Sequence, residues 1–181
     1  MDTKKLFDRF GFSPNDGPES PERIEELERL IGVRLPSDYR DFLLQVGGGY
    51  VDDLVVPCTV PTPFGELNLT SLHSVASMID LLDSDKAPRN MICISYGHFG
   101  MTGCLSVVGI DHGQVFALDT EMRFFWDAKT LKRMPSLDPS IKEFFRMRDA
   151  KKLPERPWGY ENCYHVADSF TEFLDKMETF Q

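Results

Sequence analysis

Apolar residues recur at helical spacing in a stretch near the start of the chain. Ile24, Leu27 and Ile31 lie three or four residues apart, a Ser-Pro pair at 20–21 precedes them, and Gly32 follows. Serine caps helix N-termini, proline suits the first helical position, and glycine commonly ends a helix. The pattern therefore predicts a helix between the proline and the glycine.

A second helix is predicted after a short extended piece at residues 33–35. Pro36 opens it, and the glycines at 47–49 end it, because each glycine would cost about 1 kcal/mol inside a helix. Its apolar face is formed by four side chains: Tyr39, Phe42, Leu43 and Val46. Two short helices with apolar faces need a partner layer, and the following segments predict a β-sheet.

Strand patterns dominate the middle of the chain. Strands are expected at five segments, which are Tyr50–Val56, Glu66–Leu72, Met91–Ser95, Cys104–Val108 and Gln114–Leu118. The last two are joined by Asp111-His112-Gly113, a tight reversal whose glycine accommodates a positive φ, so they should form an antiparallel hairpin. Phe124-Phe125-Trp126 is a candidate for one more strand.

Three later segments carry helix signals. Ser74 caps the first, and Asp138-Pro139 begins the second, whose last turns are basic. Ser169 and Glu172 form a capping box for the third. Each signal precedes an apolar stripe at helical spacing, so these helices should cover the sheet.

Length and composition are typical of one domain. A chain of 181 residues buries roughly 70% of its extended-state surface, so its core needs no metal or disulfide. Residues 1–19 hold Phe10 and Phe12 and then a turn-rich stretch, and we expect them to form a loosely packed lead-in. No run of about 18 apolar residues occurs and the N-terminus lacks the apolar core of a signal peptide, which predicts a cytoplasmic protein.

Charge is distributed unevenly along the chain. Residues 123–156 contain ten Lys and Arg against five Asp and Glu, a local charge of +5, so with a net charge of −9 the remainder carries −14. An acidic body repels nucleic acid and anionic membranes and attracts basic partners over about 8 Å at physiological salt. The alternative is that the acidity serves solubility alone. The charge thus predicts a protein partner, with neither nucleic acid nor a membrane.

The order of these signals resembles a known family. A Glu-rich helix runs into Gly-Val-Arg-Leu-Pro at 32–36 and Tyr-Arg-Asp-Phe-Leu at 39–43, and a Gly-rich stretch at 97–103 precedes a strand. The returning hairpin strand at 115–119 and Asp-Ser-Phe-Thr-Glu-Phe-Leu at 168–174 complete the pattern. Together these motifs resemble the SMI1/KNR4 family of the SUKH superfamily.

The resemblance covers about Ser20–Leu118 and Asp168–Met177. It implies an α+β fold with a mixed, mostly antiparallel sheet, backed by the N-terminal helices and a C-terminal helix. It also implies no enzymatic activity, since bacterial members are largely immunity proteins that neutralise toxin domains, often nucleases, and fungal members are regulators. The chain departs from the family pattern at His98 and at 123–165, so we expect one domain over 20–181 with an insertion at 123–165.

Signals for catalysis or cofactor binding are weak. No Gly-x-Ser-x-Gly elbow occurs, which leaves Cys104 near His98 as a conceivable nucleophilic pair. Gly97, Gly100 and Gly103 suggest a phosphate loop, but neither the P-loop lysine nor a following helix accompanies them. We therefore expect no catalytic residues and no cofactor, with a small-molecule enzyme as a distant alternative.

Cysteines and histidines are scattered. The cysteines, Cys58, Cys93, Cys104 and Cys163, form no Cys-x-x-Cys pair, and the favoured interpretation is that they are small core residues, with disulfides and zinc as alternatives. The histidines, His73, His98, His112 and His165, have no partner at i, i+4. We therefore expect no metal site.

Acidic and aromatic residues coincide at three of the expected loops. Asp52 and Asp53 follow the glycines at 47–49; Tyr96, His98 and Phe99 occupy the Gly-rich loop; and Asp119 and Glu121 leave the hairpin strand. In an antiparallel sheet all three loops can emerge along one edge, so we expect these seven residues to form a partner-binding surface. The alternative surface is the basic, aromatic segment 123–160, whose aromatic residues either pack it onto the sheet or remain exposed for binding.

These observations lead to a functional expectation. We expect a non-enzymatic immunity protein that covers the active site of a basic toxin domain, and that acts as a monomer or weak dimer. The competing hypothesis is a scaffold or regulatory module that binds endogenous proteins. A toxin gene immediately upstream would favour the first hypothesis.

Overall fold

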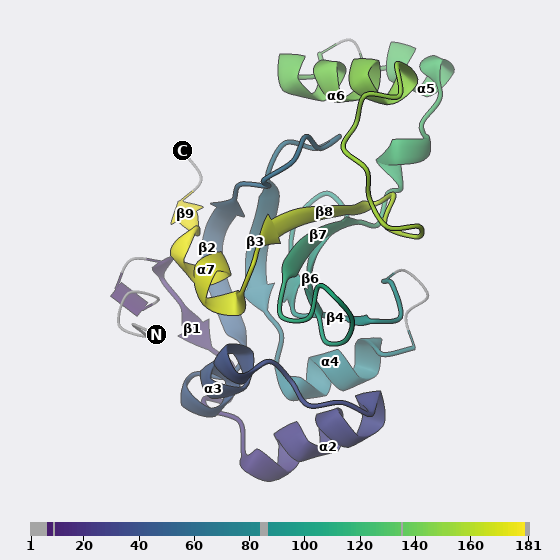
Figure 1. Ribbon diagram of the computed structural model, residues 1–181. Helices are drawn as coiled ribbons and strands as arrows, with labels where there is room; N and C mark the ends of the chain where they lie inside the picture. Colours follow the sequence, from purple (N-terminus) through teal and green to yellow (C-terminus); the bar gives the residue numbers. More distant parts are fainter. Residues whose placement is uncertain (1–6, 9, 84–86, 135, 180–181) are drawn as a thin grey trace.

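The computed structural model describes residues 7, 8, 10–83, 87–134 and 136–179 of the chain. Within these ranges, the chain forms helices and two antiparallel sheets, and the expected α+β class is confirmed. In Figure 1 the helices from the first half of the chain gather at one end of the molecule and those of residues 128–149 lie at the other. The strands fill the space between these two ends.

The two sheets are built from strands that alternate between them along the chain. The first contains β1 (Ser13–Pro14), β2 (Gly49–Val56), β3 (Leu67–Leu72) and β5 (Ser95–Tyr96) in the order β1-β2-β3-β5, and β9 (Glu178–Thr179) also pairs with β2. The second contains β4 (Met91–Cys93), β6 (Met101–Ser106), β7 (Val115–Asp119) and β8 (Cys163–Ala167) in the order β4-β6-β7-β8. The hairpin expected around residues 111–113 is confirmed as β6 and β7.

Ile94 marks the point at which the chain passes from one sheet to the other. Its N–H donates to the carbonyl oxygen of Gly103 in the second sheet, at 2.8 Å. Its carbonyl oxygen accepts from the N–H of His73, which follows β3 of the first sheet, also at 2.8 Å. The single strand expected over 91–95 is therefore divided into β4 and β5, and the two sheets meet at this residue.

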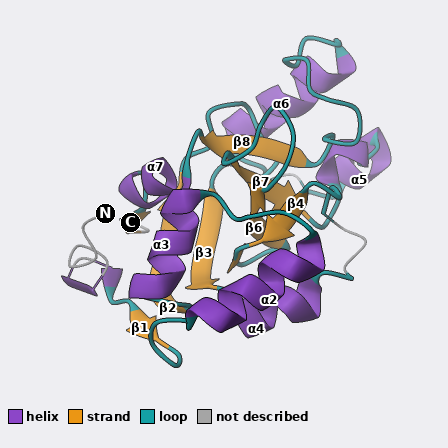
Figure 2. Cartoon of the chain, turned by 60° about the horizontal axis from the view of Figure 1, so that its bottom comes forward, coloured by secondary structure: helices purple, strands orange, loops and turns teal. Residues whose placement is uncertain are grey.

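The N-terminal helices form where the apolar spacing predicts them. Ser20 caps α2 (Pro21–Ile31), with its Oγ accepting from the N–H of Arg23 at 3.3 Å, and Gly32 ends it at φ 75°. α3 (Ser37–Gln45) and α4 (Val75–Leu81) follow, and α4 lies alongside α2 in Figure 2. The core-facing side chains of α2 and α3 are fully buried: Ile24, Leu27, Phe42 and Leu43.

The strand expected at 124–126 is wrong, because the chain turns there. The segment is a 3-10 helix, η1 (Arg123–Phe125), followed by α5 (Ala128–Lys132) and α6 (Pro139–Asp149). The carboxylate of Asp119 accepts hydrogen bonds from the backbone N–H groups of Glu121 and Arg123. These bonds curl the chain immediately after β7 and end the extended conformation.

β8 was not predicted from the sequence, and neither were the two-residue strands β1 and β9. β8 pairs with β7 and completes the second sheet, and α7 (Phe170–Asp175) follows it with Ser169 as its cap. The capping box is thus confirmed on its serine side, with the N–H of Glu172 donating to Ser169 Oγ at 3.1 Å. β8 begins inside the segment 123–165, and the division of the chain into one domain with an insertion there stays a prediction.

The expectation of a loosely packed lead-in is wrong for residues 10–14. Phe10 and Phe12 are 1% and 5% exposed and belong to the main core, and β1 pairs with the start of β2. The aromatic rings outweigh the turn-rich composition, because burying a phenylalanine gives about 1.5 to 3 kcal/mol. Residues 1–6 and 9 of the expected lead-in lie outside the described residues.

Candidate partner-binding surface

A short loop, residues 97–100, joins β5 to β6 and approaches β3 closely. A Cβ atom at Gly97 would collide with the backbone carbonyl of Asn68, and Gly100 adopts φ 71°. The N–H of Gly97 donates to the carbonyl oxygen of Met101 at 3.0 Å and closes the loop. Close packing and a left-handed turn therefore account for two of the three glycines that resemble a phosphate loop.

Phe99 projects from this loop into solvent. Its side chain is 74% exposed. Its backbone holds a left-handed conformation at φ 58°, which non-glycine residues rarely adopt. The carbonyl oxygen of Phe99 accepts a hydrogen bond from Nη2 of Arg123 at 2.6 Å, and that of Gly100 accepts from the N–H and Oγ1 of Thr120, each at 2.8 Å. The loop is thus fastened from behind while the ring stays free.

Asp119 lies beneath the loop rather than on its surface. It is 1% exposed, and its Oδ1 accepts from Nη1 of Arg123 at 2.5 Å. Burial raises the pKa of its carboxyl group, while hydrogen bonds and the charge of Arg123 act against that rise. The expectation that Asp119 offers its charge to a partner is therefore wrong, since the residue instead positions Arg123.

Three of the predicted residues come together around Phe99. His98 Nε2 lies 3.1 Å from Oδ1 of Asp53, and both side chains are more than half exposed. The rings of His98 and Phe99 lie 5.9 Å apart. Glu121 lies against Gly100, because a Cβ atom at that glycine would meet its Cγ at 2.7 Å. A carboxylate therefore stands on each side of the loop.

Tyr96 and Asp52 have other neighbours. Tyr96 and Tyr50, which are both exposed, pair with Ser71 in the first sheet, so the two rings belong to the same face of that sheet. Asp52 instead lies beside Gly11 of the N-terminal segment, where a Cβ atom would collide with its carboxylate. The bulge in β2 between Tyr50 and Leu54 explains why Asp52 and Asp53 have different neighbours.

Two hollows flank Phe99 and share it as a wall. The smaller, of about 210 Å³, lies between Asp53, His98 and Phe99, and the larger, of about 790 Å³, extends towards Trp126 and Met134. Asn68 also lines both. We define the Phe99 surface as six residues that line these hollows, together with Glu121, which lies beside the loop at Gly100: Asp53, Asn68, His98, Phe99, Trp126, Met134 and Glu121.

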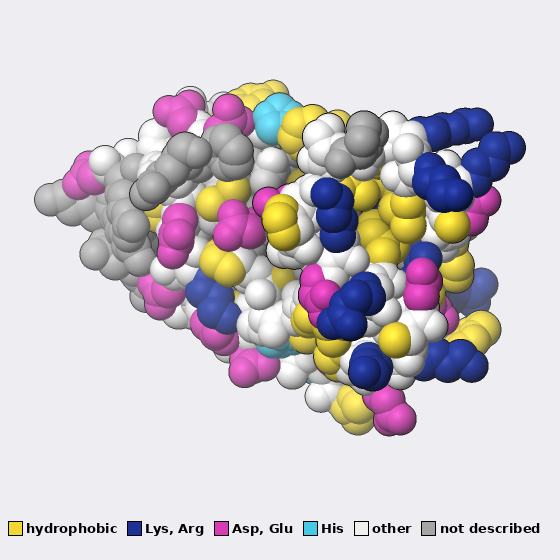
Figure 3. All heavy atoms as spheres, turned by 90° about the horizontal axis from the view of Figure 1, so that it is seen from above, with side chains coloured by type: hydrophobic (Ala, Val, Ile, Leu, Met, Phe, Trp, Pro, Cys, Tyr) yellow, Lys and Arg dark blue, Asp and Glu magenta, His cyan; other side chains and the backbone are white. Residues whose placement is uncertain are grey.

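Opposite charges border this surface. The basic last turns of α5 and α6 belong to the segment that carries the excess of Lys and Arg. Figure 3 shows Lys and Arg side chains concentrated on the right of the face seen from above, the side on which α5 and α6 lie in Figure 1, and Asp and Glu mostly on the left. The larger hollow reaches Arg123 and α6, whereas the smaller one contains Asp53.

Other candidate chemistry finds no support in the geometry. Cys104 is fully buried and contacts Cys93, whereas the exposed His98 contacts Asp53, so the pair considered for catalysis has separate partners. Within the described ranges, no group of three or more His, Cys, Asp or Glu side chains could hold a metal ion. No helix of the described chain is long and apolar enough to cross a membrane.

Several residues of the surface were not predicted from the sequence. Asn68 and Met134 carry no local signal, because they meet Phe99 only through the folding of distant segments. Trp126 stands in the aromatic run for which packing and exposure were both considered, and it proves partly buried at the rim of the larger hollow. Outside the Phe99 surface, Tyr50 is also 64% exposed, although its position after the three glycines predicts only a strand.

Comparison with known proteins gives a relative and a family. The chain is 32% identical to the SPbeta prophage-derived uncharacterized protein YokK of Bacillus subtilis (strain 168), and the matched region covers 56% of this chain and 62% of the relative. The chain thus spans 62% of the length of that relative. The model of the SMI1 / KNR4 family (SUKH-1) matches residues 18–176, a range that includes both sheets except β1 and β9 and also includes the Phe99 surface. The chain therefore belongs to the SMI1/KNR4 family.

Proposed function

We propose that this chain is a non-enzymatic immunity protein that neutralises a toxin domain by covering its active site with the Phe99 surface. Membership of the SMI1/KNR4 family supports the proposal, because this family is commonly of the immunity-protein type. A blocking protein needs a preformed interface of roughly 1,600 Å², with a few buried anchors that supply most of the affinity.

The exposure of Phe99 is the observation that carries the proposal. An aromatic ring that is 74% exposed, held in an unfavourable backbone conformation and set between two hollows contributes little to the fold. Such strain is maintained where the surrounding structure fixes it, and it concentrates at functional sites. Rings of this kind act as anchors in interfaces because they bury a large area with little loss of conformational entropy.

The charges beside Phe99 favour a basic partner. Asp53 and Glu121 flank the loop, and the chain carries a net charge of −9. Opposite charge on the partner would speed its capture, and many nuclease domains are basic because they bind a polyanion. The partner we propose is therefore a basic toxin domain that acts on nucleic acid.

A growth-rescue experiment tests the proposal. Cells that produce a candidate toxin domain, such as one encoded immediately upstream of this gene, should survive when they also produce the wild-type chain, and should die when they produce Phe99→Asp. Trp158→Asp is the matched control, because Trp158 is 96% exposed and lies outside the Phe99 surface. Rescue by both variants would refute the role of Phe99.

A different result would favour the competing function. If the wild-type chain gave no protection against the toxin, but retained an endogenous protein that Phe99→Asp releases and Trp158→Asp keeps, the chain would be a regulatory binding module. The Phe99 surface would then be supported as a binding surface, and the immunity function would be refuted.

A further inference from the structure

Cys93 and Cys104 face one another across two antiparallel strands. They are register partners in the ladder between β4 and β6, and their Sγ atoms lie 3.6 Å apart. The adjacent pair, Ile94 and Gly103, is hydrogen-bonded, so the cysteines form a non-hydrogen-bonded pair, in which the two Cα atoms lie about 4.5 Å apart. Disulfide-bonded cysteines have Cα separations in this range, and side-chain rotation can bring the sulfurs to a bonded distance of about 2 Å.

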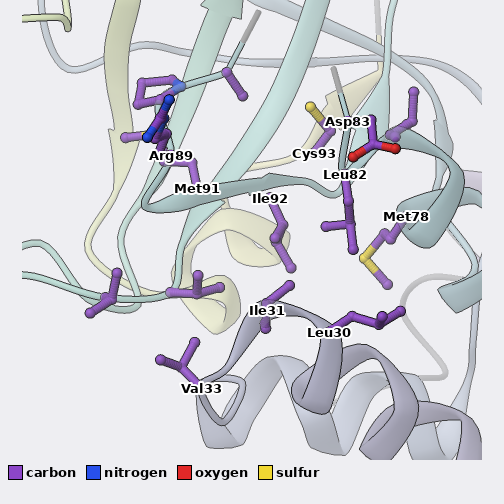
Figure 4. A pocket seen from close by; sticks show the side chains of 15 residues that line it. Leu30, Ile31, Val33, Met78, Leu82, Asp83, Arg89, Met91, Ile92 and Cys93 are labelled. Carbon is purple, nitrogen blue, oxygen red and sulfur yellow. The ribbon is translucent and has the colours of Figure 1, made fainter. Parts of the chain in front are cut away.

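The two thiols differ in access and in acidity. Cys104 is fully buried, whereas Cys93 is half-buried and lines a hollow of about 770 Å³ that α2, α4 and β4 enclose (Figure 4). The hydrogen bond with Cys104 lowers the pKa of Cys93, and the same contact together with burial raises the pKa of Cys104 well above its usual value. Cys93 is therefore the thiol that ionises first and that a small molecule reaches first.

The other two cysteines lack this arrangement. Burial raises the pKa of Cys58 and of Cys163 to about 12 in each case. Cys163 lies two strands away from Cys104, since Cys104 pairs with Phe116 and Cys163 pairs with Leu118. Neither residue combines access with an adjacent second thiol.

We propose that Cys93 and Cys104 form a redox-modification site for low-molecular-weight disulfides. The Cys93 thiolate attacks one sulfur of the small disulfide, which forms a mixed disulfide and releases one small thiolate. That thiolate accepts the proton of Cys104, whose sulfur then attacks Sγ of Cys93 and expels the second small thiolate. One protein dithiol and one small disulfide thus become one protein disulfide and two small thiols, with the proton lost by Cys93 taken up by the second.

The bond would close a ring around the loop that carries Phe99. Residues 94–103 lie between the two cysteines, and they contain β5 and the whole of loop 97–100. A cross-link between β4 and β6 opposes their local separation, so loop 97–100 should exchange its amide hydrogens more slowly in the oxidised protein. Any effect of this slower exchange on partner binding rests on the proposed function, whereas the disulfide itself does not.

Reaction with oxidised glutathione tests the site on the full-length wild-type protein. Chymotrypsin cleaves after Tyr96 and Phe99, so it separates the two cysteines unless a disulfide joins their peptides. We expect non-reducing mass spectrometry to find the Cys93–Cys104 cross-link, and Cys93 to react about tenfold or more faster than Cys58, which is also only half-buried. A Cys104–Cys163 cross-link, or equal rates at Cys93 and Cys58, would overturn the proposal.

Two serine variants separate the steps of the reaction. Cys104→Ser should accumulate glutathione on Cys93 as a stable mixed disulfide, because the second thiol is missing. Cys93→Ser should leave the buried Cys104 unmodified, and Cys58→Ser should behave as the wild type does. Failure of Cys104→Ser to retain glutathione would refute Cys93 as the attacking thiol, whatever the outcome of toxin rescue.

Discussion

Arg123 and Asp119 form an ion pair that fastens the loop of Phe99 to the second sheet. Nη1 of Arg123 donates to the buried Oδ1 of Asp119 at 2.5 Å, and Nη2 of the same guanidinium donates to the carbonyl oxygen of Phe99 at 2.6 Å. The backbone N–H of Arg123 donates to the other carboxylate oxygen at 2.8 Å. One side chain thus links the end of β7 to the exposed loop, which couples the stability of the fold to the geometry of the surface.

Replacement of Arg123 by methionine should destabilise the protein. The change preserves most of the side-chain volume but leaves the carboxylate of Asp119 buried without its cation, a loss that typically costs about 3 to 5 kcal/mol. Chemical denaturation measures the effect. Arg146→Met is the control, because Arg146 pairs with Glu143 on an exposed helix face, where solvent screens the pair and its loss should change stability little. Equal losses in the two variants would contradict the role of the buried pair.

The cost of Arg123→Met should depend on pH. Burial already raises the pKa of Asp119 in the folded wild type, and the loss of the guanidinium removes an influence that lowers it, so the folded pKa rises further. A raised folded pKa gives stability that is present at low pH and lost as pH increases through that pKa. The difference between variant and wild type should therefore be smallest near about pH 4 and grow towards about pH 7.

Truncation of Phe99 should weaken partner binding without destabilising the fold. For Phe99→Ala we expect a loss of about 2 kcal/mol or more in binding, mainly through faster dissociation, since a buried anchor acts after encounter. Binding kinetics with the proposed toxin partner and thermal unfolding of the chain measure the two effects. Trp158→Ala should alter neither quantity, although Trp158 is the more exposed of the two rings.

Neutralisation of the carboxylates beside the loop should slow association instead. Asp53→Asn suits the backbone at φ 29°, because asparagine tolerates positive φ, and Glu121→Gln keeps the side-chain size. The double variant should associate several-fold more slowly at low salt and show a weaker salt dependence, with little change in dissociation. Measurements at two ionic strengths separate these effects. Unchanged association at low salt would show that the acidic groups play no part in capture.

The sequence predicts helices and hairpins well because their signals are local. Ser20 and Gly32 bound α2 as expected, and the reversal at 111–113 forms the hairpin of β6 and β7. β8 (Cys163–Ala167) escapes prediction because four of its five residues are buried, so its one polar residue, His165, produces no polar alternation. The turn at η1 escapes because it depends on the carboxylate of Asp119, a polar residue that the fold buries.

The surface is predictable only in part for a similar reason. Asp53, His98 and Phe99 attract notice as acidic or aromatic residues in or shortly after glycine-rich stretches, and the structure brings them together. Asp119 carries the same local signal, yet it is buried, because a single sequence does not reveal which carboxylate an arginine will pair with. Asn68 becomes part of the surface only through the approach of loop 97–100 to β3.

Gly97 offers the sharpest test of that approach. A methyl group at this position would collide with the carbonyl oxygen of Asn68, so Gly97→Ala should push the loop from β3 and cost about 1 to 3 kcal/mol in stability. Gly113→Ala is the control, because Gly113 has open space around it and its φ of 90° imposes backbone strain of a similar order far from the loop. Both variants should lose stability, but only Gly97→Ala should speed hydrogen exchange in the loop and weaken binding through Phe99. If Gly97→Ala matched the wild type in both stability and binding, the loop would not rest on β3. The idea that β3 holds Phe99 in a fixed position would then be refuted.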